Sequence, residues 1–91
     1  MTDEEILEIT KLNLAITNPV WDVYLNNLIQ VSRSAIAREG ITLNSASVED
    51  CNLIVMYAAY LFRKRVEDVA PMPRMLRYAL NNRVMAEKGA V

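Results

Sequence analysis

Few side chains in this sequence are suited to chemistry. The 91 residues include no histidine, one cysteine and two glycines. Histidine is the commonest general base and metal ligand, a structural zinc site needs several Cys or His ligands, and a phosphate-binding loop needs closely spaced glycines. The sequence therefore predicts no catalytic site, no metal site and no cofactor, and we expect that the protein is not an enzyme.

The single cysteine and two pairs of adjacent carboxylates are the remaining reactive groups. Cys51 lies in an apolar helical segment, where a free cysteine usually serves as a small core residue. Glu49-Asp50 and Glu67-Asp68 are neighbours in sequence, and neighbouring side chains on a helix do not face each other. We expect these carboxylates to be helix caps or solvated groups rather than a catalytic pair.

The segment from Pro73 to Gly89 has the most unusual surface. At 100° per residue, one side of a helix here gathers polar side chains with a tyrosine beside them, namely Arg74, Arg77, Asn81, Lys88 and Tyr78. The other side gathers apolar residues, namely Met75, Leu76, Ala79 and Leu80. Arg83 falls in the middle of this apolar side.

Two interpretations of this basic helix stay open. The basic side is either a solvated helix face, or a ring-forming interface or basic strip that faces a channel. Arg83 either extends its guanidinium to solvent from the edge of the core, or pairs with a carboxylate of its own chain or of a neighbour. The candidate interface residues are Arg74, Arg77, Tyr78, Asn81 and Arg83.

Helix signals precede this segment along the chain. Thr2 and Glu5 match a capping box that begins a first helix of roughly three turns. Asn18-Pro19 begins a long second helix, which continues to about Glu39 and stops at Gly40. Residues 41–43 are expected to be extended or irregular, and no substantial sheet is predicted.

The third predicted helix is capped by Ser45 or Ser47, is apolar on nearly every side and ends in Arg63-Lys64-Arg65. Glu67-Asp68 is assigned to the following linker, Pro73 opens the fourth helix and Gly89 closes it. A helix apolar all round must be surrounded by other elements, and a small chain has few to offer, so other copies of the chain are candidates to cover it. We expect Trp21 to pack under the first or third helix, and five third-helix residues to be mostly buried: Leu53, Met56, Tyr57, Tyr60 and Leu61.

Length and composition favour a single small all-α domain over residues 1–91, a bundle of about four helices. The net charge is −1, which gives no global electrostatic argument for nucleic-acid binding. The acidic N-terminus does not resemble a signal peptide, and the apolar run from Leu53 to Phe62 is too short to span a bilayer. A cytoplasmic protein without a membrane partner is expected.

The order of these elements resembles the small head–tail connector proteins of tailed bacteriophages and prophages, also called head-completion or adaptor proteins. The resemblance covers nearly the whole chain: an acidic capped helix, the long second helix WDVYLNNLIQVSRSAIAREGI, the apolar helix MYAAYLFRKR and the segment MPRMLRYALNNR. It is most specific over Met56–Arg65 and Met72–Arg83.

The resemblance implies a structural virion protein that acts in virion assembly and DNA packaging. Such connectors form an oligomeric ring of roughly a dozen subunits beneath the portal, extend the DNA channel and receive tail or stopper proteins. DNA passes through the ring without being read, and the subunits can be monomeric in isolation. The implied location is the host bacterial cytoplasm during assembly and then the head–tail junction of the virion.

Two alternatives belong to other classes. A small helical regulator could use the arginine-rich fourth helix as a DNA-recognition helix, although the sequence pI of about 5.3 and the lack of a clear helix-turn-helix argue against it. The other alternative is an accessory subunit of an enzyme. Migration of short duplex DNA at low salt separates the regulator from the connector.

Overall fold

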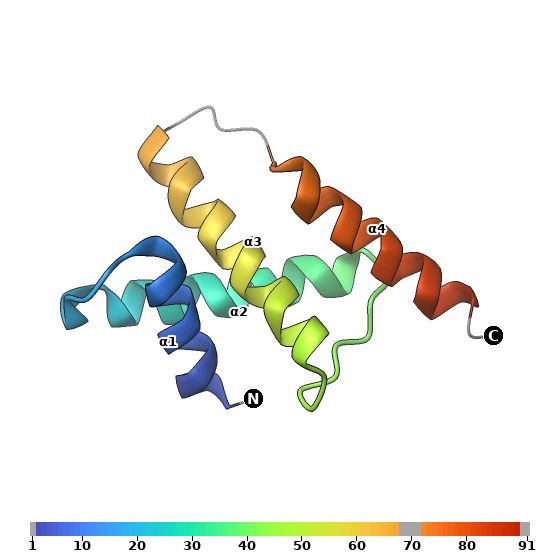
Figure 1. Cartoon of the computed structure of the whole chain (residues 1–91), viewed down its shortest axis with the longest axis horizontal. Coiled ribbons are helices and arrows are strands. Elements are labelled where there is room, and N and C mark those ends of the chain that lie inside the picture. The colour runs from blue at the N-terminus through green and yellow to red at the C-terminus, as the bar shows by residue number, and fades with distance from the viewer. Residues whose placement is uncertain (1, 68–71, 90–91) are drawn as a thin grey trace.

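The computed structural model describes residues 2–67 and 72–89, and these residues form helices and no strand. The helices are α1 (Asp3–Leu14), the 3₁₀ turn η1 (Pro19–Trp21), α2 (Asp22–Arg38), α3 (Val48–Glu67) and α4 (Arg74–Gly89). In Figure 1, α2 passes behind α3, while α1 and α4 lie on opposite sides of α3. The prediction of a small all-α bundle with four helices is confirmed.

Local side-chain chemistry explains where the first two helices begin. The Thr2 hydroxyl accepts a hydrogen bond from the Glu5 backbone N–H at 3.2 Å, and the Glu5 carboxylate accepts one from the Thr2 N–H at 3.1 Å. This reciprocal pair is the predicted capping box. The Asn18 side chain caps the 3₁₀ turn by accepting from the Val20 N–H at 3.0 Å, so the predicted second helix begins with a 3₁₀ turn before its α-helical part.

The ends of α2 and α3 also follow local rules, with one correction. Gly40 follows α2 with a φ of 94°, a left-handed conformation that glycine adopts at little cost. The Ser47 hydroxyl caps α3 by accepting from the Asp50 N–H at 3.3 Å. Glu67, assigned to the linker in our prediction, is the last residue of α3, which at 20 residues is longer than the 17-residue α2. Asp68 lies outside the described residues.

The core forms where α1, α2 and α3 meet and extends to the inner side of α4. Its most enclosed side chains come from all four helices: Ile6, Leu25, Ile29, Ile36, Cys51, Ala58, Leu76 and Leu80. Cys51 is therefore a buried core residue with a free thiol, as its apolar surroundings in the sequence predicted. The loop after α2 contributes Ile41, which is also buried.

The middle of the third helix is covered on all sides, but not equally. Leu53 is fully buried, and the other four predicted residues pack against the core with a minor part of their surface exposed: Met56, Tyr57, Tyr60 and Leu61. Met56, Tyr57 and Tyr60 project from the opposite side of the helix to Cys51, Val55 and Ala58. The prediction that these residues are mostly buried is confirmed, although the neighbouring helices cover one side of α3 more completely than the other.

Trp21 packs against the third helix, as predicted, but at the edge of the fold. Its ring makes an edge-to-face contact with Phe62, with centroids 5.6 Å apart, and a second one with Tyr24 at 6.4 Å. The residue keeps 36% of its surface exposed. The indole is thus a partly solvated cover over the end of α3.

Candidate functional site

The helix α4 has an inner and an outer side with different surroundings. Leu76 and Leu80 point inward and are fully buried, with Ala79 and Val84 packed partly beside them. Met75 was predicted to share this apolar side, yet it is 76% exposed. It lies 100° around the helix from Leu76, and the rest of the chain covers only a narrow strip of α4, so Met75 falls outside that strip.

Apolar side chains are concentrated on the outer side of α4. Tyr78 is 58% exposed and Met85 is 70% exposed, which with Met75 makes three large apolar side chains in solvent on one helix. With Asn82 they form a line at positions 75, 78, 82 and 85, which we call the outer seam. Scattered exposed apolar residues are ordinary, but three of them on one side of a single helix make that side a candidate contact surface.

Arg83 is held by an intrachain network rather than left free at the core edge. Its Nε lies 2.7 Å from Asp50 Oδ1, its Nη1 2.8 Å from Glu87 Oε2, and its Nη2 donates to the Thr42 carbonyl at 2.9 Å. Of the two predicted roles, the structure shows pairing with carboxylates of its own chain. We call Arg83, Asp50, Glu87 and Thr42 the Arg83 clamp.

Asp50 is the buried member of the Arg83 clamp, with only 2% of its surface exposed. It also accepts a hydrogen bond from the Asn44 N–H at 2.8 Å, so this carboxylate links the loop before α3 to α4. The hydrogen bond from Arg83, helped by that from Asn44, lowers the pKa of Asp50 below its ordinary value against the opposing effect of burial. The pKa of Arg83 is raised first by its hydrogen bond to Asp50 and then by its hydrogen bond to Glu87.

The other predicted interface residues divide into two groups. Arg74, Tyr78 and Asn81 are exposed, and no ion pair involves Arg74 within the described residues. Arg77 is partly covered and its Nη1 lies 3.5 Å from Glu39 Oε2 at the end of α2. The structure therefore keeps three of the five residues on one open surface, ties Arg77 loosely to α2 and uses Arg83 internally.

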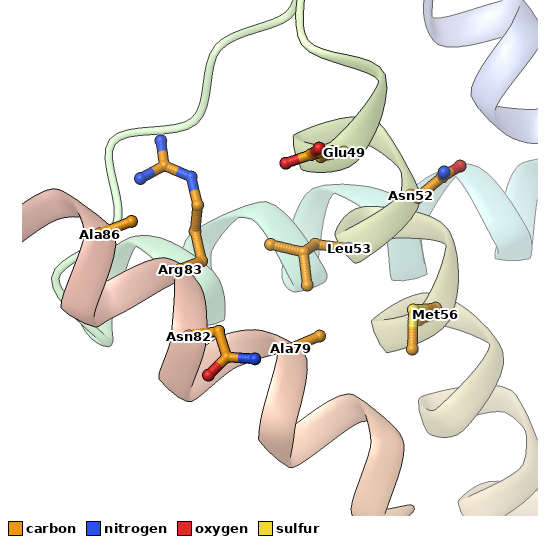
Figure 2. A pocket seen from close by; sticks show the side chains of 8 residues that line it. All are labelled: Glu49, Asn52, Leu53, Met56, Ala79, Asn82, Arg83 and Ala86. Carbon is orange, nitrogen blue, oxygen red and sulfur yellow. The ribbon is translucent and has the colours of Figure 1, made fainter.

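A groove of about 380 Å³ lies between α3 and α4, next to the outer seam. In Figure 2, Leu53 of α3 and Ala79 of α4 point toward the space between the two helices. Met56 and Ala86 add apolar lining, and four polar residues complete it: Glu49, Asn52, Asn82 and Arg83. The groove runs between two helices, and most of its exposed lining is apolar. It therefore suits an apolar side chain from a partner better than a polar small molecule.

The residues that the structure describes offer neither a metal site nor a membrane-spanning helix. Among the described residues, no group of three or more His, Cys, Asp or Glu side chains is placed to hold a metal ion. Within the same ranges, no helix has the length and apolar character that crossing a membrane requires.

Sequence reasoning missed Met85 and Asn82 as surface residues, although their heptad-like spacing from Met75 and Tyr78 was visible.

Comparison with known proteins identifies no relative: no family model, no curated protein and no solved structure matches the chain.

Proposed function

We propose that this protein is a structural connector of a tailed phage or prophage, which assembles as a ring beneath the portal and joins the DNA-filled head to the tail. The observation that carries the proposal is the outer side of α4. It places Met75, Tyr78 and Met85 in solvent beside Arg74. Methionine, tyrosine and arginine are the residue types enriched in protein interfaces.

The way α4 is attached supports an assembly role. Leu76 and Leu80 anchor its inner side, and the Arg83 clamp fixes it to α3 and to the loop at Thr42. The outer seam is consequently presented on a helix whose position is set, and a preformed surface loses less entropy on binding. The sequence resemblance over Met56–Arg65 and Met72–Arg83 is the reason for proposing a connector rather than another kind of assembly protein.

In this role the protein binds portal and tail or stopper proteins, and DNA passes through the ring without sequence readout. Assembly takes place in the host bacterial cytoplasm, and the product resides at the head–tail junction. The net charge of −1 is compatible with a conduit, because strong phosphate binding would slow the passage of DNA.

Binding to a portal ring tests the proposal. Purified protein is mixed with portal rings encoded in the same genome, and the complex is analysed by electron microscopy. We expect extra density beneath the portal for the wild-type chain, and its loss for Arg74→Glu combined with Tyr78→Ser. The matched control is Arg38→Glu with Asn26→Ser on the exposed side of α2. Failure of the wild-type chain to bind the portal, or normal tailed virions without it, contradicts the connector role.

DNA recognition by α4 is the competing proposal, and one observation favours it. Arg74, Asn81 and Lys88 are exposed along the helix and free to reach phosphates or base edges. Arg83, however, is occupied by the clamp. A shift of short duplex DNA that depends on base sequence at low salt would replace the connector proposal with this one.

A further inference from the structure

The outer seam has the spacing of a helix-pairing surface. Met75, Tyr78, Asn82 and Met85 are separated by three, four and three residues, which is the repeat of the a and d positions along a helix that packs on another helix. Ala79 and Ala86 border the seam on the side of the groove between α3 and α4. Small residues there leave room for a second helix to approach.

Basic side chains accompany the outer seam. Arg74 stands at the start of α4 and Lys88 at its end, and neither has an ion-pair partner within residues 2–67 and 72–89. The other charged residues of the helix are engaged, since Arg83 pairs with Glu87 and Asp50, and Arg77 lies near Glu39. The charge that α4 offers to a partner is therefore positive.

The complementary surface is on α1. Its outward side has Glu4, Glu8 and Leu12 at one-turn intervals, and Leu12 is 80% exposed. Neither Glu4 nor Glu8 has an ion-pair partner in the described part of the chain, whereas Asp3 is paired with Arg33. This side of α1 thus combines an exposed leucine with free negative charge, which matches an apolar seam flanked by positive charge.

The fold separates these two surfaces. In Figure 1, α1 and α4 lie on opposite sides of α3, so each is open to a different neighbour. Contact between unlike surfaces on opposite sides of a subunit is heterologous, and repetition of such a contact closes a ring when the rotation permits. Pairing α4 with α4 of a second copy would instead bring Arg74 and Lys88 against the same charges.

We infer that the outer seam of α4 in one copy docks against the Glu4, Glu8 and Leu12 side of α1 in the next copy. This inference rests on the proposed ring assembly and names its subunit contact. Glu4 and Glu8 are about 6 Å apart along their helix axis, and Arg74 and Lys88 are about 21 Å apart along theirs. Both carboxylates therefore face the cation at one end of the seam, while Leu12 lies toward its apolar side chains. The electrostatic part of the contact weakens as salt screens the exposed charges.

Complementary charge reversal tests the contact. One variant carries Glu4→Lys and Glu8→Lys, a second carries Arg74→Glu and Lys88→Glu, and a third carries all four changes. Self-association is measured by sedimentation and by concentration-dependent amide NMR shifts, from micromolar to millimolar protein at low salt. Arg38→Glu with Lys64→Glu, on exposed sites away from both surfaces, gives the same change in net charge as the second variant and controls for it.

We expect wild-type shifts on α1 and α4 together, and association at least about tenfold weaker in each two-site variant, because like charges then face each other. Association should return in the four-site variant and in an equal mixture of the first two variants. The absence of any concentration-dependent shift up to millimolar protein would overturn the inference. Association of the Glu4 and Glu8 variant at the wild-type level would also overturn it, and so would a shift confined to α4.

The same variants separate this inference from the proposed function. Portal binding and tail joining by the Glu4 and Glu8 variant at wild-type level would overturn the α1–α4 contact and leave the connector role standing. Association through α1 and α4 by a chain that never binds a portal would overturn the connector role instead.

Discussion

The two sides of α3 are covered in different ways. Toward α1 and α2, apolar side chains such as Ile6, Leu25 and Ile54 form a continuous core. Toward α4, the contact combines a short apolar strip at Leu76 and Leu80 with the buried ion pair of Arg83 and Asp50. The first arrangement stabilises the fold chiefly by burial of apolar surface. The second fixes the position of a helix whose outer side remains open, as the proposed assembly surface would require.

The largest expected effect comes from the fully enclosed side. Leu25→Ala should lower the free energy of unfolding by about 3–5 kcal/mol, because it removes transfer free energy and leaves a cavity where no solvent enters. Leu61→Ala, at a position with a minor part of its surface exposed, should cost about 1–2 kcal/mol. Urea denaturation followed by circular dichroism measures both. Equal losses at the two positions would contradict the difference in enclosure.

The next effect concerns the Arg83 clamp. Arg83→Met should lower the free energy of unfolding by about 2–4 kcal/mol, since it leaves the buried Asp50 carboxylate without its cation. This loss is smaller than for a fully buried ion pair, because 23% of the Arg83 side chain is exposed and water can reach the pair. Asp50→Asn in the Arg83→Met background should recover part of the loss, as a double-mutant cycle would show. Additive losses would argue against coupling.

Acid should weaken the same clamp. The pKa of Asp50 lies below its ordinary value, first because Arg83 donates hydrogen bonds to the carboxylate. The folded state therefore binds fewer protons, so this contribution is complete above the ordinary value of about 3.9 and is lost as the pH falls through the folded pKa. The decline in stability below about pH 4 should be shallower in Asp50→Asn than in the exposed control Glu49→Gln. Parallel declines would count against this role of Asp50.

The smallest effect on stability is expected on the outer seam. Met75→Ser and Met85→Ser should change the free energy of unfolding by under about 0.5 kcal/mol each, because both side chains are already in solvent. The same changes should weaken self-association or portal binding. A loss of stability as large as that of Arg83→Met would show that the seam is covered within the chain.

Local rules predicted the helix boundaries best. The Thr2 and Glu5 capping box, the stop at Gly40 and the Ser47 cap depend on residues within one turn of each other, so their chemistry can be recognised in the sequence. The extension of α3 through Glu67 was missed, because no glycine or proline marks the end of that helix.

Enclosure was harder to predict than helix position. Helical periodicity placed Met75 near Leu76, Ala79 and Leu80, but it could not show how wide a strip of α4 the rest of the chain covers. Arg83 pairs with Glu87 one turn away, a spacing visible in the sequence, but its buried partner Asp50 comes from 33 residues earlier in the chain. At that separation spacing carries no information, so the sequence left two roles open and the structure selected one.

The most direct test of the central claim is photo-crosslinking from the outer seam. Tyr78→p-benzoylphenylalanine places a photoreactive group at the middle of the seam, and Asn26→p-benzoylphenylalanine places one on the exposed side of α2. Both proteins are irradiated after mixing with portal rings from the same genome. The connector account predicts adducts to a second copy or to the portal from position 78 and few from position 26. Equal adducts from both positions, or none from position 78, would contradict it.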